Sequence, residues 1–131
     1  MKWSFFIDGL PVAQGRPRAM VTPGGHIRVY DPDRSRAWKN AVALASLPYK
    51  PRQPSEKAIH VRVTFAFIAP KRLKNRLCHH IAKPDIDNLL KLCLDSLVGI
   101  FIRDDKQVIC VEAEKVYGSS PGMNIEIEEV E

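Results

Sequence analysis

One alternating segment, residues 58–68, constrains the fold of this chain more than any other feature. Its apolar side chains share one face: Val61, Val63, Phe65 and Phe67. The opposite face is polar and carries His60, Arg62 and Thr64. Alternation over such a long run is typical of a half-buried β-strand. We therefore interpret His60 as a solvated strand residue rather than as a metal ligand.

Weaker patterns on both sides of this strand predict the other strands. They are expected at 3–8, 19–22, 26–30, 106–117 and 122–129. The second and third of these flank Pro23-Gly24-Gly25, a sequence typical of a hairpin turn. Residues 10–18 contain two prolines and a glycine, which favour an irregular loop.

Two helices complete the expected fold. The first begins at Asp31-Pro32, because aspartate caps helices and proline suits their first position, and it runs to about Leu47. One face of it presents Trp38, Val42 and Ala45. The second spans about 86–98 and stops at Gly99. This order of elements predicts a single compact α/β (α+β) domain over residues 1–131, with a mixed β-sheet packed with two main helices.

Composition narrows the partners and the compartment. The formal net charge of +5 suits a polyanion such as nucleic acid, although charge alone is weak support. The three cysteines, Cys78, Cys93 and Cys110, are widely spaced, which favours reduced thiols. We find no run of about 20 apolar residues and no apolar stretch at the N-terminus long enough for a signal peptide. A cytoplasmic protein is expected.

The second helix carries an unusual polar strip. Successive helical residues turn by about 100°, so one narrow wedge holds Asp87, Asn88, Lys91 and Asp95 on a helix that is otherwise apolar nearly all round. Such a helix is expected to be largely buried, with this strip reaching a cleft. Buried charges are costly unless they pair, reach solvent or bind something.

The start of this helix offers two interpretations. Pro84 favours an extended chain before it, and a hinge between extended chain and helix could aim Asp85 and Asp87 at one point. Mg²⁺ typically takes one or two carboxylates together with waters and phosphate oxygens. Alternatively, either aspartate simply caps the helix. The residues alone leave both interpretations open.

A second acidic pair, Asp104-Asp105, precedes a predicted strand. It is either an ordinary turn or the source of a third carboxylate. In a nuclease site, one or two metals activate water and stabilise the leaving oxygen, and Lys91 could neutralise the scissile phosphate. Glu112 and Glu114 share one face of the following strand. We interpret them as solvated residues or as residues that contact the metal ligands rather than the metal.

Basic side chains gather before the acidic motif. Residues 71–83 contain Lys71, Arg72, Lys74, Arg76, His79, His80 and Lys83. Arg16 and Arg18, in the early loop, are further candidates for phosphate contacts. Any one of these side chains can be an ordinary solvated residue, but the cluster favours DNA. Zinc binding by the adjacent His79 and His80 is rejected, because they lack spaced partners.

These motifs resemble the RusA family of Holliday junction resolvases. The resemblance rests on Lys83-Pro84-Asp85-Ile86-Asp87-Asn88-Leu89-Leu90-Lys91, then Leu94-Asp95-Ser96-Leu97, then Asp104-Asp105-Lys106-Gln107-Val108. The loop Gly15-Arg16-Pro17-Arg18 is similar to that of phage and prophage members. One departure is Lys83-Pro84, where some members carry arginines before the first aspartate.

The resemblance implies a homodimeric endonuclease that binds four-way DNA junctions in recombination and repair. Such an enzyme makes paired symmetrical cuts with Mg²⁺, for which Mn²⁺ substitutes. The resemblance assigns metal-binding catalytic roles to Asp85, Asp87 and Asp105, and a catalytic role to Lys91. It implies supporting roles for Asn88, Asp95 and Asp104. Two alternatives stay open: a junction-binding module without catalysis, and a metal enzyme acting on a small phosphate ester.

Overall fold

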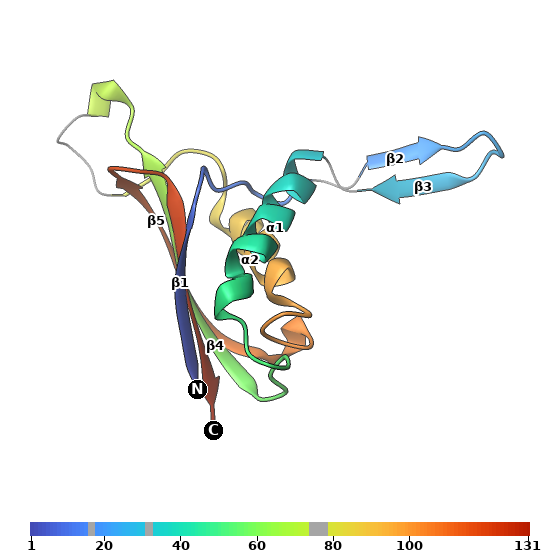
Figure 1. The fold of residues 1–131 in the computed structure, drawn as a ribbon. Helices are drawn as coiled ribbons and strands as arrows, with labels where there is room; N and C mark the ends of the chain where they lie inside the picture. The colour runs from blue at the N-terminus through green and yellow to red at the C-terminus, as the bar shows by residue number, and fades with distance from the viewer. Residues whose placement is uncertain (16–17, 31–32, 74–78) are drawn as a thin grey trace.

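The computed structural model describes residues 1–15, 18–30, 33–73 and 79–131. Figure 1 shows a sheet with two helices against one of its faces. The main sheet has the strand order β1-β6-β4-β5 and comprises β1 (Lys2–Asp8), β6 (Gly122–Val130), β4 (Ala58–Ile68) and β5 (Val108–Gly118). The helices are α1 (Asp33–Ser46) and α2 (Ile86–Leu97). The predicted α+β fold with a mixed sheet and two helices is confirmed.

Strand β4 lies inside the sheet and occupies the predicted span, 58–68. It pairs antiparallel with β6, where Val63 lies opposite Ile125, and parallel with β5, where Phe65 lies opposite Lys115. Parallel neighbours need a crossover connection. Here the crossover contains α2, which covers the face on which β4 buries its alternating apolar residues.

Helix α2 is largely buried, as predicted. Its buried side chains are Leu89, Leu92, Cys93, Ser96 and Leu97. The Ser96 hydroxyl donates to the Leu92 carbonyl at 2.7 Å, so its polar atom is satisfied inside the core. Burial raises the pKa of the Cys93 thiol to about 12. Cys93 and Cys110 are unpaired, as predicted, whereas Cys78 lies outside the described residues.

Helix α1 buries Ser35, Trp38, Val42 and Ser46. The prediction that Ala45 shares the buried face is wrong, because Ala45 is exposed. The buried stripe continues four residues beyond Val42 rather than three, and the Ser46 hydroxyl is satisfied by the Ala43 carbonyl at 2.8 Å. The predicted start at Asp31-Pro32 lies outside the described residues.

A separate ribbon of two strands, β2 (Arg18–Val21) and β3 (Ile27–Tyr30), extends away from the rest of the molecule in Figure 1. The hairpin prediction is confirmed, and its turn is closed by a bond from the Thr22 amide to the His26 carbonyl at 2.7 Å. The ribbon exposes four apolar side chains: Met20, Val21, Ile27 and Val29. Isolated two-stranded ribbons are only marginally stable in water.

Short 3₁₀ turns complete the chain: η1 (Leu47–Tyr49), η2 (Lys71–Leu73) and η3 (Asp105–Gln107). The last one delays β5, so this strand begins at Val108 rather than at the predicted residue 106. Among the described residues, we find no helix that is both long enough and apolar enough to span a membrane.

Candidate active site

Asp85 stands where extended chain turns into helix α2. Its backbone is extended, with φ −73° and ψ 144°, while its carbonyl accepts the Leu89 amide at 3.1 Å. The predicted hinge is therefore present. Within the described part of the chain, the Asp85 side chain makes no capping hydrogen bond. The capping interpretation does not apply to Asp85, and its exposed carboxylate is available for another task.

The predicted polar wedge of α2 reaches the surface. Asp87, Asn88 and Lys91 are exposed, and Asp95 is partly buried. The Lys91 ammonium lies 3.5 Å from the Asp95 carboxylate, one helical turn away. Exposed pairs of this kind stabilise a helix only weakly, so Lys91 can turn toward another anion at little cost.

The early loop touches the same end of α2. The Gln14 backbone amide donates to the Asn88 backbone carbonyl at 3.0 Å. The next amide, that of Gly15, donates to the Ser35 hydroxyl of α1 at 2.8 Å. These two bonds place the loop between the two helices, close to the first turn that carries Asp87.

Asp104 does act as a cap. Its carboxylate accepts the Lys106 amide at 2.9 Å, while the Gln107 side chain accepts the Asp104 amide at 2.8 Å. Together they form a capping box. The pKa of Asp104 is lowered, chiefly by the hydrogen bond from the Lys106 amide. The turn interpretation thus applies to Asp104, and the following carboxylate, that of Asp105, is exposed.

The far end of α2 borders a hollow of about 320 Å³. Three carboxylates and one cation line it, together with Val98: Asp95, Asp104, Asp105 and Lys39. The structure thus brings Asp105 beside Asp95. Asp85 and Asp87 do not line this hollow; Asp87 lies two turns of α2 before Asp95, roughly 12 Å along the axis.

Carboxylate chemistry at these positions fits a hard divalent cation. Within the described ranges, no three His, Cys, Asp or Glu side chains are close enough to hold one ion. Mg²⁺, however, often takes only one or two protein carboxylates and completes its shell with water and substrate phosphate. Asp85 and Asp87 are exposed and two residues apart, so they fit that smaller requirement.

The predicted DNA-contacting residues are placed only in part. Lys71 and Arg72 are exposed in η2, and Lys83 is exposed just before Pro84. Arg18 begins β2. The predicted contacts Arg16, Lys74 and Arg76 lie outside the described residues.

His80 does not belong to the basic surface. It is 7% exposed, and its ring stacks on Phe67 with centroids 4.1 Å apart and contacts Tyr117 at 5.0 Å. Burial, and then the charge of Lys115, lower the pKa of His80. Its Nδ1 atom has no hydrogen-bond partner among the described residues. His80 therefore packs as an aromatic side chain and holds this part of the chain against Phe67 and Tyr117.

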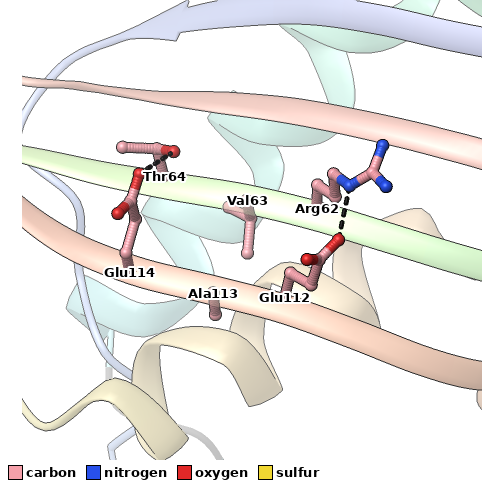
Figure 2. A pocket seen from close by; sticks show the side chains of 6 residues that line it. All are labelled: Arg62, Val63, Thr64, Glu112, Ala113 and Glu114. Carbon is pink, nitrogen blue, oxygen red and sulfur yellow. Dashed lines mark hydrogen bonds and ion pairs between the residues drawn. The ribbon is translucent and has the colours of Figure 1, made fainter.

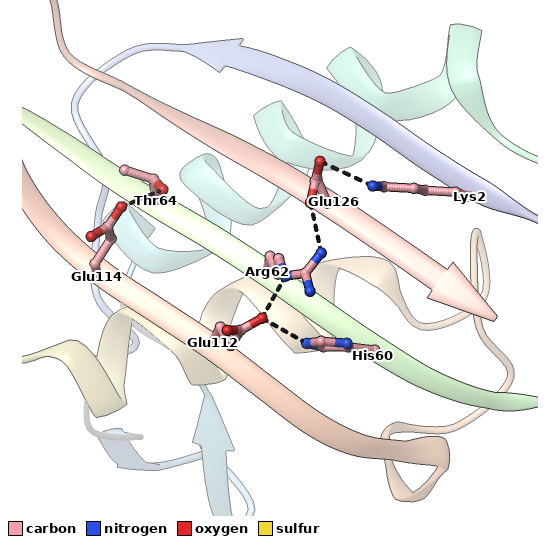
Figure 3. A network of polar contacts seen from close by, with 7 residues as sticks. All are labelled: Lys2, His60, Arg62, Thr64, Glu112, Glu114 and Glu126. Atoms are coloured by element: carbon pink, nitrogen blue, oxygen red, sulfur yellow. Dashed lines mark hydrogen bonds and ion pairs between the residues drawn. The ribbon is translucent and has the colours of Figure 1, made fainter. Parts of the chain in front are cut away.

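Glu112 and Glu114 lie on the sheet face away from the helices. Glu112 pairs with Arg62 and with the His60 ring at 3.0 Å, while Thr64 donates to Glu114 at 3.3 Å (Figures 2 and 3). A hollow of about 290 Å³ is bordered here by Arg62, Thr64, Glu112 and Glu114.

The charges of this outer face satisfy one another. Arg62 also reaches Glu126 at 3.5 Å, and Glu126 pairs with Lys2 at 3.4 Å. Contact with Arg62 lowers the pKa of Glu112, and contact with Glu112 raises the pKa of Arg62. Because Glu112 and Glu114 lie across the sheet from α2, they are solvated strand residues and do not support the carboxylates of the helix.

Sequence reasoning assigned no role to three side chains near these carboxylates: Lys39, Gln107 and Lys115. Lys39 reaches its hollow only through the packing of α1 against α2, so no local pattern marks it. Gln107 was detectable, because it stands three residues after the capping Asp104. Lys115 was also detectable, because it interrupts the inward series Ala113, Lys115 and Tyr117 of an alternating strand.

Comparisons with known proteins identify the family. The sequence profile of the family described as "Endodeoxyribonuclease RusA" matches residues 8–128. The chain is 31% identical to a Bacillus subtilis (strain 168) protein called "Uncharacterized protein YqaN", over 96% of this chain and 95% of that protein. It is 28% identical to the "Crossover junction endodeoxyribonuclease rusA" of Lactococcus phage r1t, over 98% of both chains.

Proposed function

This chain belongs to the RusA endodeoxyribonuclease family, and we propose that it is a metal-dependent enzyme that resolves four-way DNA junctions by paired symmetrical cuts. The observation that carries this proposal is the position of the Asp85 carboxylate, which lies at the N-terminus of α2 without capping the helix. Asp87 and Lys91 follow on the same helix, in the order that the family motif requires. The name of the phage relative supports junction DNA as the substrate.

The residues have distinct tasks in this proposal. Asp85 and Asp87 would hold Mg²⁺, or Mn²⁺ in its place, and Lys91 would neutralise charge on the scissile phosphate. Asp105 is proposed as the third ligand, which requires it to move from the hollow beside Asp95 toward these two carboxylates. A bound divalent ion supplies an activated water and stabilises the leaving oxygen. Three residues support this set. Asp95 pairs with Lys91 at 3.5 Å, Asn88 binds the early loop through its backbone carbonyl, and Asp104 caps the turn that carries Asp105.

DNA must approach a negatively charged site, so cations around it are required. We assign this task to Arg16, Arg18, Lys71, Arg72, Lys74, Arg76 and Lys83. Lys83 is exposed two residues before Asp85, which suits it to the phosphate next to the one that is cut. We propose that the enzyme meets its DNA substrate in the cytoplasm.

Paired cuts on opposite strands need two active sites, so we propose a homodimer. The apolar ribbon of β2 and β3 supports self-association, because monomeric proteins rarely leave several large apolar side chains exposed together on one small element. A two-fold dimer would place identical sites symmetrically on a four-way junction.

The test is cleavage of four-way, three-way and linear duplex DNA side by side, with Mg²⁺ and with EDTA. We expect symmetrical cuts in the four-way junction, dependent on Mg²⁺ or Mn²⁺, and little cutting of linear DNA. Salt-sensitive junction binding without cutting under any metal condition would instead identify a junction-binding module. Preferential hydrolysis of a small phosphate ester, undiminished by competing junction DNA, would also contradict the proposal.

A further inference from the structure

The chain that leads into α2 runs along the free edge of the sheet. Strand β5 lies at the end of the strand order β1-β6-β4-β5. Beside it, His79 bridges to Val116, and the His80 amide donates to the Lys115 carbonyl at 3.2 Å. This approach segment, residues 79–84, is the yellow coil that enters α2 in Figure 1.

Apolar packing holds only the first part of the approach segment. His80 is buried between aromatic rings. Beyond it, Ile81 is 85% exposed, and Ala82 and Lys83 are exposed as well. The last residues before Asp85 therefore need another source of order.

Lys115 provides that order. It occupies an inward position of β5, where its strand neighbours on the same side are Ala113 and Tyr117, and it is partly buried. Its ammonium donates to the Ala82 carbonyl at 2.7 Å and to the Pro84 carbonyl at 2.8 Å. Among the described residues, no carboxylate lies within ion-pair distance of it. A partly buried charge must be satisfied, and here two backbone carbonyls satisfy it.

The second of these bonds acts directly next to the proposed ligands. The Pro84 carbonyl belongs to the peptide group that joins Pro84 to Asp85. Asp85 in turn opens α2 by accepting the Leu89 amide. A charge-assisted bond of 2.8 Å to that peptide therefore fixes the point at which Asp85 leaves the extended chain, and hence the first turn that carries Asp87.

We propose that Lys115 is a positioning residue, which aims the Asp85 and Asp87 carboxylates by holding the Ala82 and Pro84 carbonyls. This inference rests on the proposed role of these aspartates as metal ligands. Lys115 touches neither metal nor DNA in this account. Groups that orient metal ligands from behind commonly change metal affinity or activity by about 10–100-fold when removed.

The test compares Lys115→Met, which keeps the length of the side chain but removes its donors, with Lys115→Arg, which keeps donors and charge. Lys50→Met is the matched control, because Lys50 is an exposed lysine outside the helices and strands. Three quantities are measured: Mn²⁺ affinity by electron paramagnetic resonance, the Mg²⁺ concentration for half-maximal junction cleavage, and hydrogen exchange of the Leu89 amide, which donates to the Asp85 carbonyl.

For Lys115→Met we expect a loss of Mn²⁺ affinity of about 10-fold or more, with a parallel rise in the half-maximal Mg²⁺ concentration and faster exchange of the Leu89 amide. Junction binding in EDTA should stay unchanged. Lys115→Arg should restore most of the metal affinity, and Lys50→Met should match the wild type. A general loss of stability would not produce a metal-specific effect that arginine rescues.

Wild-type metal affinity and wild-type exchange in Lys115→Met would overturn the inference while leaving the proposed function intact. Should Lys115→Met fail to fold, Lys115→Gln, which keeps a neutral donor, replaces it and is expected to show an intermediate loss. Failure of the proposed function is separate and appears as a wild-type protein that neither binds Mn²⁺ nor cuts junctions. Hydrogen exchange of the Leu89 amide then still decides whether Lys115 orders the start of α2.

Discussion

Replacement of Gln107 by alanine should destabilise the protein, because one amide side chain joins two distant segments. Its oxygen accepts the Arg103 and Asp104 amides, both at 2.8 Å. Its nitrogen donates to the Ser55 and Lys57 carbonyls, also at 2.8 Å. The turn that carries Asp104 is thereby tied to the chain that precedes β4.

The expected cost follows from these four bonds. A typical intramolecular hydrogen bond contributes about 0.5–1.5 kcal/mol net. Because most of the partners are exposed to water that can replace the amide, we expect a total near the lower end, about 2 kcal/mol. For a chain of this size, such a loss lowers the melting temperature by roughly 6–10 °C.

Equilibrium urea unfolding measures the cost, with Gln53→Ala as the control, because Gln53 is an exposed glutamine in the preceding irregular segment. The control should change the free energy of unfolding by less than about 0.5 kcal/mol. Gln107→Ala should also slow junction cleavage at a temperature where it stays folded, since η3 carries Asp105. A stability equal to that of the control would refute this reading of Gln107.

Two further predictions concern individual side chains. Asp85→Asn should leave the melting temperature nearly unchanged but reduce junction cleavage by about 100-fold or more, since even the removal of a group that only orients a metal ligand costs about 10–100-fold. Asp104→Asn should keep most of the cleavage activity, because asparagine caps as well as aspartate. Equal losses of activity in both variants would contradict the division of roles. Burial lowers the pKa of His80 below its ordinary value of 6.5, so its neutral form is favoured in the folded state and stability falls as the pH drops through and below 6.5. His80→Phe should therefore lose less stability than the wild type between about pH 7.5 and pH 5.5 in urea unfolding, and parallel losses would show that His80 does not titrate in this way.

Much of the fold was predictable because local patterns and tertiary packing agree. Strand β4 follows strict alternation and has the predicted span, and α2 begins one residue after the predicted hinge aspartate, Asp85. The position of Ala45 was not predictable to this precision, since the end of a buried stripe depends on how far the neighbouring element extends.

The roles of the aspartates could not be separated from sequence. Asp85 and Asp104 both stand at the start of a helical turn, and either could cap it. Only the structure shows that Asp104 caps and Asp85 does not. The place of Lys39 in the hollow beside Asp95 could not be predicted from sequence either, because it depends on packing between two helices that lie far apart in sequence.

The most direct test of the account is a single-turnover cleavage assay on a four-way junction in Mg²⁺, with wild-type protein and Asp87→Asn, alongside junction binding in EDTA. We predict that the wild type cuts opposite strands symmetrically, whereas Asp87→Asn binds the junction normally and does not cut it. Cutting by Asp87→Asn at the wild-type rate would contradict the assignment of this carboxylate to the metal and, with it, the proposed active site.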